Sequence, residues 1–193
     1  PRPTDIDVDG SGRMYVASWK NGKFAFTGPD VGFVVQITPV DYTPKPFPDL
    51  ERASDTDLVS YLGEPSAVYR LHAQRELLRR GATEGRWRKV AQAASVSDAP
   101  LYGRVAAIYT LAQFGDEASH AELLKMAEDD AVREFVLRAL TDRRSALQGL
   151  PLAPFVEALQ DTNPRVRAQA LICLGRLGRA EAAAAMLPLT MRR

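Results

Sequence analysis

Four arginines recur along the chain at a spacing of roughly thirty residues, and each is followed three and seven residues later by an apolar side chain. They are Arg70, Arg104, Arg133 and Arg167. A guanidinium group donates several N–H groups in a fixed fork that suits carboxylates. The four could therefore form a row that binds an acidic partner. Alternatively, each could pair with an acidic residue or a carbonyl of the neighbouring repeat.

The acidic run near the N-terminus imitates the start of a calcium loop. Asp5, Asp7 and Asp9 alternate and are followed by Gly10. A calcium loop of the EF-hand type requires a bidentate Glu at its twelfth position, and Val16 stands there. The run is better interpreted as a strand that ends in an acidic turn.

Few other residues could do chemistry. His72 and His120 are the two histidines, and neither has a second His or Cys nearby to share a metal. His72 lies off the apolar stripe, so we expect it to face solvent or line a groove. Cys173 lies on an apparently buried helix, where a thiol is expected to be inert. We expect no catalytic residue, cofactor site or metal site in this chain.

The apolar residues that follow the arginines define the elements that carry them. Steps of three and four place Ala73, Ala107, Val136 and Ala170 on one helix face with Leu77, Leu111, Leu140 and Leu174. A fixed period of this kind indicates stacked helical repeats. The sequence predicts helix pairs over about 55–80, 84–115, 118–144 and 152–178, and a further helix from about Ala180.

Local signals mark the ends of these helices. Ser54 or Asp55 can cap the first helix, and Asn163 followed by Pro164 is typical of a helix start. Eleven residues after three of the arginines come Gly81, Gly115 and Gly178, where we expect left-handed helix ends. The third copy has Arg144 at this position and is the weakest.

Residues 1–38 have a different character. Strands are predicted over 5–9, 13–19 and 32–37, with a turn at 10–12 and a loop rich in Gly, Asn and Lys over 20–30. Three strands cannot easily cover their own apolar face, so this segment needs a partner sheet that the chain does not contain. Residues 39–54 hold Pro39, Pro44, Pro46 and Pro48 and are predicted to be an extended linker. Residues 55–193 are the predicted repeat domain.

The segment from Phe155 to Gly178 resembles a HEAT repeat, with Asp161, Pro164 and Val166-Arg167 at the turn and the second helix. The resemblance extends over about 55–178 and implies a mainly α fold, a right-handed α-solenoid of about four HEAT-like repeats. Asp161 is then expected to bond to the backbone or to an arginine at the turn. In HEAT arrays, recurring arginines more commonly have a structural role than a partner-binding one.

Residues 2–19 and 28–37 resemble a blade of a six-bladed propeller of the sorbosone-like dehydrogenase type, and residues 63–78 resemble the first repeat after such a propeller. In large, exported bacterial proteins of this membrane-bound dehydrogenase kind, HEAT repeats follow the propeller. The resemblance implies PQQ or haem c as a cofactor of the parent protein, and a periplasmic or exported location. Ala17-Ser18-Trp19 departs from the family's usual Ala-Asp-Trp, and no Cys-x-x-Cys-His occurs.

Composition narrows the choice of partner. Basic and acidic residues number 25 and 24 and give a net charge of +1, which argues against a nucleic-acid partner. No run of about 18 apolar residues predicts a membrane span. The chain begins at Pro1 and ends at Arg193, which suggests a fragment of a longer protein.

The sequence thus favours a non-catalytic scaffold that braces or spaces neighbouring domains of the same polypeptide, or binds a protein partner. One alternative is a part of a propeller-type sugar or alcohol dehydrogenase coupled to a cytochrome c. Another, suggested only by the repeat type, is a HEAT-like bilin lyase or chaperone.

Overall fold

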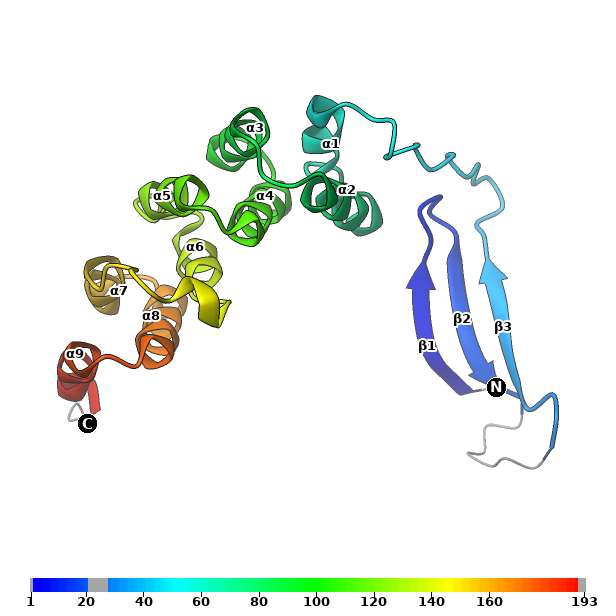
Figure 1. Cartoon of the computed structure of the whole chain (residues 1–193). Coiled ribbons are helices and arrows are strands. Elements are labelled where there is room, and N and C mark those ends of the chain that lie inside the picture. The colour runs from blue at the N-terminus through cyan, green and yellow to red at the C-terminus, as the bar shows by residue number, and fades with distance from the viewer. Residues whose placement is uncertain (1, 21–27, 191–193) are drawn as a thin grey trace.

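The computed structural model describes residues 2–20 and 28–190, without the side chains of 188–190. The predicted loop at 20–30 and the Met191–Arg193 end therefore lie largely outside the described residues. Figure 1 shows an arc of helices at one end of the chain and a small sheet at the other, joined by an extended segment. No described helix is long and apolar enough to cross a membrane.

The helices alternate between two rows of the arc (Figure 1). The outer row consists of α1 (Asp55–Tyr61), α3 (Glu84–Ser95), α5 (Glu117–Met126), α7 (Ala153–Glu157) and α9 (Ala180–Thr190). The inner row consists of α2 (Ala67–Arg80), α4 (Leu101–Phe114), α6 (Arg133–Leu140) and α8 (Pro164–Leu177). The predicted pairs and the further helix from Ala180 are confirmed. Together they form a helical repeat fold.

The inward stripe of the inner row is buried as its spacing predicts. Every member of the two sets that follow the arginines, from Ala73 and Leu77 to Ala170 and Leu174, has no exposed surface. Alanine or valine at the first position lets neighbouring helices approach, and leucine at the second fills the space between the rows. This stripe forms the centre of a continuous core.

The predicted helix starts agree with the structure. Ser54 caps α1 by accepting from the Asp57 N–H, and Asp57 accepts in return from the Ser54 N–H, which makes a capping box. Asn163 caps α8, and Pro164 is its first residue. Of the two residues that the sequence offers as the cap of α1, Ser54 and Asp55, Ser54 is the cap in the structure.

The glycine prediction is correct at two of three positions. Gly115 and Gly178 end α4 and α8 in the left-handed region. Gly81 is the exception, because its φ of 77° is combined with a ψ of 171°. At Gly81 the backbone leaves α2 in an extended direction toward α3, so this helix does not end in a left-handed turn. The third copy, which lacks the glycine, ends α6 at Leu140 and continues through a short 3-10 turn at Arg144–Ala146.

The sheet is antiparallel, in the order β1 (Arg2–Val8), β2 (Met14–Trp19) and β3 (Gly32–Ile37). β1 begins at Arg2, three residues before the predicted strand, because its pairing with β2 continues beyond a bulge near Pro3 and Asp5. Ile6 lies opposite Val16, which lies opposite Val35, so all three project from one face. This apolar face is exposed, with Ile6 61% accessible.

The proline-rich segment attaches the sheet to the helices through two aromatic side chains. The Tyr42 hydroxyl donates to the carbonyl of Ser11 at the hairpin turn, over 2.5 Å. The Phe47 ring lies against Gly10, where a Cβ would collide with it. The same ring makes an edge-on contact with Tyr69 at the start of α2, with centroids 5.0 Å apart. The segment is therefore a packed connection.

Candidate functional site

The four recurrent arginines lie at the start of the inner-row helices. Each donates hydrogen bonds to carbonyl groups at the end of the preceding outer-row helix or in the turn that follows that helix. Arg104 Nε donates to the Ala94 carbonyl over 2.7 Å. Arg133 Nε donates to the Ala127 carbonyl over 2.7 Å. The last carbonyls of a helix lack partners within that helix, so the guanidinium groups satisfy them.

The first and last arginines repeat this contact on the connecting turns. Arg70 Nη1 donates to the carbonyls of Glu64 and Pro65 over 2.6 and 2.7 Å. Arg167 Nη1 donates to the carbonyls of Asp161 and Thr162 over 2.8 and 3.0 Å. Each arginine thus fixes the turn inside its own helix pair.

Three of the arginines also contact the next pair along the arc. Arg104 Nη2 lies 2.6 Å from Asp129 Oδ2, and Arg133 Nη1 lies 2.6 Å from Asp161 Oδ2. Arg70 lies over the ring of Tyr102, 4.7 Å from its centroid, in a cation–π contact. The structural alternative, pairing with an acidic residue or a carbonyl, is therefore realised by contacts within and between pairs.

Asp161 connects the turn to this row of arginines. Its Oδ1 accepts from the Asn163 N–H over 2.7 Å, while its Oδ2 accepts from Arg133. The backbone hydrogen bond from Asn163, followed by the Arg133 guanidinium, lowers the pKa of this carboxyl group. The two alternatives expected for Asp161, a bond to the backbone and a bond to an arginine, occur together, but the arginine is Arg133 of the preceding helix pair and not one at the turn.

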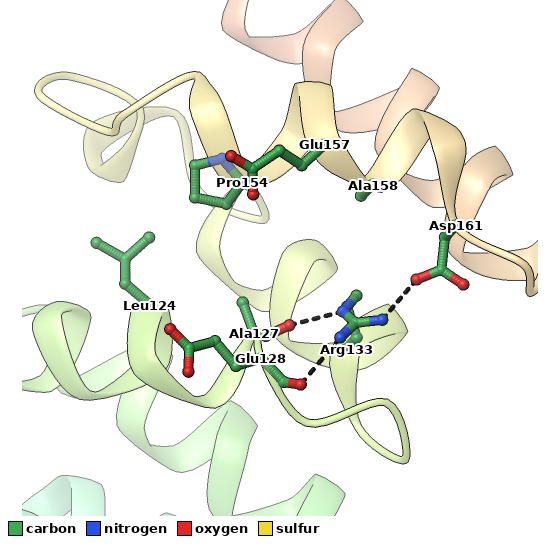
Figure 2. Close-up of a pocket in the computed structure, with 8 residues that line it drawn as sticks. All are labelled: Leu124, Ala127, Glu128, Arg133, Pro154, Glu157, Ala158 and Asp161. Carbon is green, nitrogen blue, oxygen red and sulfur yellow. Dashed lines mark hydrogen bonds and ion pairs between the residues drawn. The ribbon is translucent and has the colours of Figure 1, made fainter.

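Arg133 also lines a pocket of about 340 Å³ between α5 and α7. Figure 2 shows its guanidinium group between the carbonyls of Ala127 and Glu128 and the carboxylate of Asp161. The donors of Arg133 are thus engaged within the chain. Arg104 is only 3% exposed. Partner binding by the whole row stays a prediction, and Arg167 is the most accessible of the four.

A second charged cluster was not anticipated from the sequence. Glu76 on α2 is buried, yet it accepts two 2.7 Å bonds from Arg79 and one from Arg80. Arg80 and Arg86 also bind Asp55 at the start of α1, over 3.0 and 3.1 Å. The sequence does contain a signal for this cluster, which is the spacing of Arg79 and Arg80 from Glu76, because residues three and four positions apart share one face of a helix.

This cluster holds the first helices and the linker together. Arg80 Nη2 donates to the carbonyls of Leu50 and Glu51, both over 3.0 Å. The hydrogen bonds from Arg79, with the one from Arg80, lower the pKa of Glu76 to about 2. The cluster is a structural brace at the beginning of the helix array.

Of the remaining chemical candidates, Cys173 and Asp9 make structural hydrogen bonds, whereas His72 is exposed. Cys173 is buried, which raises the pKa of its thiol, and it donates to the Leu137 carbonyl over 3.3 Å. His72 is exposed and lines a groove beside Phe47. Asp9 accepts from the N–H groups of Ser11 and Arg13 at the hairpin. No group of three potential metal ligands occurs within residues 2–20 and 28–190.

Residues 121–191 match the family model of HEAT repeats. The match extends over most of α5 and all of α6–α9, so this part of the chain is similar to HEAT repeats and has the corresponding paired helices. No curated protein matches the chain. The fold and the match together support a HEAT-repeat protein, whereas the resemblance to a dehydrogenase junction finds no support in the comparison.

Proposed function

We propose that this chain is a non-catalytic scaffold, a HEAT-like array that binds a protein partner and holds neighbouring domains at a fixed spacing. The observation that carries this proposal is the row of arginine contacts described above. Three of the four arginines, Arg70, Arg104 and Arg133, tie their own helix pair to the next, which braces these pairs into an extended body. Repeats of this kind offer a long surface for distributed contacts with a partner.

The inner row supplies the side chains suited to such a surface. Its helices expose apolar and cationic groups along the array: Leu71, Arg75, Tyr102, Arg138, Leu171 and Ile172. Aromatic, aliphatic and arginine side chains are those enriched at the energetic centres of protein interfaces. A partner would contact several helix pairs at once, through apolar and cationic side chains that are distributed along the array.

Photo-crosslinking along the two rows tests this proposal. A photoreactive amino acid replaces Tyr102 or Arg138 on the inner row, and Lys89 or Glu117 on the outer row, in cells that produce the protein. We expect the same protein to be captured from both inner-row positions and from neither outer-row position. Capture that is equal from the two rows, or none from the inner row, would contradict partner binding by this surface.

We further propose that the chain is a spacer within a larger exported protein whose β structure extends the sheet. The exposed apolar face supports this, since Ile6 on β1 and Ile37 on β3 lie on the same face of the sheet and are 61% and 49% accessible. A parent dehydrogenase with PQQ or haem c rests on the sequence resemblance alone. Sequencing the flanking gene tests it: propeller blades upstream and Cys-x-x-Cys-His downstream are expected, and an isolated reading frame would refute it.

A further inference from the structure

The arginines of this chain are concentrated on the inner row of helices. The sequences of α2, α4, α6 and α8 together contain ten arginines and two glutamates. The helices of the outer row contain four basic and seven acidic residues. The net charge of the chain is only +1, so positive charge is separated toward the inner side of the arc (Figure 1). Electrostatics therefore favours an anionic partner on that side.

Eight of these ten arginines are already bonded to carbonyl groups or carboxylates of the chain, among them the four recurrent ones. Arg75 on α2 and Arg138 on α6 are the other two, and both residues are exposed. Neither guanidinium group has a hydrogen bond or an ion pair within the part of the chain that the structure describes. Their donors are therefore free for a ligand.

The two free arginines occupy the same position of the repeat. Arg75 and Arg138 each come five residues after a recurrent arginine, and Tyr109 of α4 stands at this position in the helix between them. α4 is in contact with both α2 and α6, so one residue from each of three successive inner-row helices is placed in register. Arg75, Tyr109 and Arg138 form what we term the inner arginine–tyrosine row.

The neighbours of this position show which way it faces. Gln74 of α2, four residues after a recurrent arginine, donates to Thr110 of α4, six residues after one, over 3.2 Å. The same two positions meet again where Cys173 of α8 donates to the Leu137 carbonyl of α6 over 3.3 Å. Positions three and seven are buried in the core between the rows. Because positions four and six face the helices on either side, position five points to the open inner surface of the arc.

Tyr109 gives the row a neutral hydrogen-bonding group at its centre. It is half-buried, and its hydroxyl group makes no hydrogen bond within the described residues. Burial raises the pKa of Tyr109, while Arg138 of the next inner-row helix acts in the opposite direction. The hydroxyl group therefore stays protonated at neutral pH and is able to donate to an acceptor of a bound segment.

Two carboxylates also act on Tyr109, but each already has an arginine partner. Glu134 lies 2.9 Å and Asp142 lies 3.9 Å from an arginine of α8. Arg138 is thus left without a carboxylate partner in the described chain, although acidic residues lie nearby. A carboxylate from outside the chain would supply that partner.

The spacing of the row selects the form of the ligand. Packed helices have axes about 8–10 Å apart, so Arg75 and Arg138, which are two helices apart, lie about 16–20 Å from each other. An extended strand rises about 3.3 Å per residue, so this distance corresponds to about six residues. Side chains six residues apart project from the same side of a strand. A segment with two acidic residues at this spacing would therefore reach both arginines and pass over Tyr109.

Two other sources of negative charge fit this row poorly. The stretches 21–27 and 191–193 of the chain itself contain no acidic residue. Double-stranded nucleic acid carries one charge per about 1.7 Å, whereas the row offers two cations about 16–20 Å apart with a neutral ring between them. A protein segment with well-separated carboxylates matches the row better.

We propose that the inner arginine–tyrosine row binds an extended acidic segment of a partner protein. Two aspartate or glutamate side chains, six residues apart, pair with Arg75 and Arg138, and a polar group between them accepts from the Tyr109 hydroxyl. The proposal rests on the partner-binding function proposed above and assigns it a particular surface and chemistry. The recurrent arginines hold the helix pairs together, and the residues five positions later bind the partner.

The probe is a synthetic peptide of twelve residues with blocked ends, glutamate at positions 3 and 9, and serine and threonine elsewhere. It is titrated at low ionic strength into the full chain, labelled with ¹⁵N, and followed by NMR. We expect saturable shifts centred on the inner arginine–tyrosine row. A control peptide of the same composition has its glutamates at positions 5 and 7 and reaches only one arginine. It should bind about tenfold more weakly, through the loss of roughly one charged hydrogen bond.

Matched variants of the protein assign the contacts. Arg75→Gln and Arg138→Gln should each weaken binding of the first peptide about tenfold and make the two peptides bind about equally. Tyr109→Phe removes one hydroxyl group and should weaken binding about fivefold, in the range for a neutral hydrogen bond. Arg88→Gln, the same change at an exposed position of α3 on the outer row, is the control that should bind as the parent does. Unchanged urea midpoints show that the variants are folded.

Several outcomes would overturn the proposal. They are no saturable binding up to about 1 mM peptide, equal binding of both peptides by the parent protein, and equal losses in Arg75→Gln and Arg88→Gln. Tighter binding of an oligothymidylate at the row would identify a nucleic acid as the ligand, and self-association that Arg138→Gln abolishes would identify a second copy. Crosslinks from Tyr102 that persist when Arg75 and Arg138 are both changed to Gln would refute this site alone. Their absence from the parent protein would refute the partner-binding function.

Discussion

At the residue scale, Arg104 and Arg133 each perform two tasks. Each satisfies a carbonyl at or near the end of the outer-row helix of its own pair, and each also contacts the following pair. The turn and the stacking interface therefore depend on the same side chain. Loss of that side chain should weaken both the turn and the stacking interface. Loss of an arginine that only binds a partner should leave the stability of the fold nearly unchanged.

Arg104→Ala tests this dependence. The side chain is buried, and its loss leaves the Ala94 carbonyl without this partner and Asp129 without its counter-ion. We expect the free energy of unfolding to fall by about 2 kcal/mol, in the range for hydrogen bonds to charged groups. Urea denaturation measures it, with exposed Arg138→Ala as the control. Equal, small effects of the two variants would favour the partner-binding interpretation.

Glu76 gives the protein a specific response to acid. Its pKa is lowered from 4.5 to about 2 in the folded chain. The ionised form therefore stabilises the fold fully above about pH 4.5, and this contribution is lost as the pH falls toward 2. Denaturation midpoints measured between pH 6 and pH 2 should fall less steeply for Glu76→Gln. Parallel curves for the two proteins would contradict the assignment.

At the element scale, the helices were largely predictable because their signals are local and repeated. The inward stripe and the caps at Ser54 and Asn163 depend on spacing and residue type alone. Gly81 was not predictable, because its extended exit depends on where α3 must begin. The split of the segment before α8 into a short α7 and a 3-10 turn at Ala158–Gln160 likewise had no distinct sequence signal.

Leu174→Asp should disrupt the last helix pairs. Leu174 has no exposed surface, whereas Leu171, three residues earlier on the same helix, is 37% exposed. An unpaired carboxylate at the buried position should destabilise the fold by more than about 3 kcal/mol, and Leu171→Asp should cost far less. Hydrogen exchange should show loss of protection in α7–α9 for the first variant alone. Similar exchange in both variants would refute the repeat register.

At the scale of the whole molecule, the division into strands and helices was predictable, but the connection between them was not. Four prolines indicated an extended segment, yet its composition does not reveal that Tyr42 and Phe47 bridge the hairpin turn and α2. The pairing of arginines with particular aspartates was also hidden, since it joins residues 25 and 28 positions apart. Such contacts depend on how pairs stack.

Phe47→Ala tests the connection. The ring contacts Gly10 on one side and Tyr69 on the other, so its loss should free the sheet from the helices while the helical core persists. We expect faster proteolytic cleavage within 39–53 and a larger radius of gyration in X-ray scattering, with an unchanged melt of the helices. Val40→Ala, at a fully exposed position of the same segment, is the control. Identical cleavage rates would contradict the bridging role.

The arginine–aspartate bonds also have a mechanical consequence. Each of the two bonds joins adjacent pairs over 2.6 Å, so side-chain length contributes to the distance between the pairs. We expect a longer acid at either aspartate to change the geometry of one junction only, because each bond belongs to a single junction. Each of these junctions therefore has its own polar link beside the hydrophobic core that it buries.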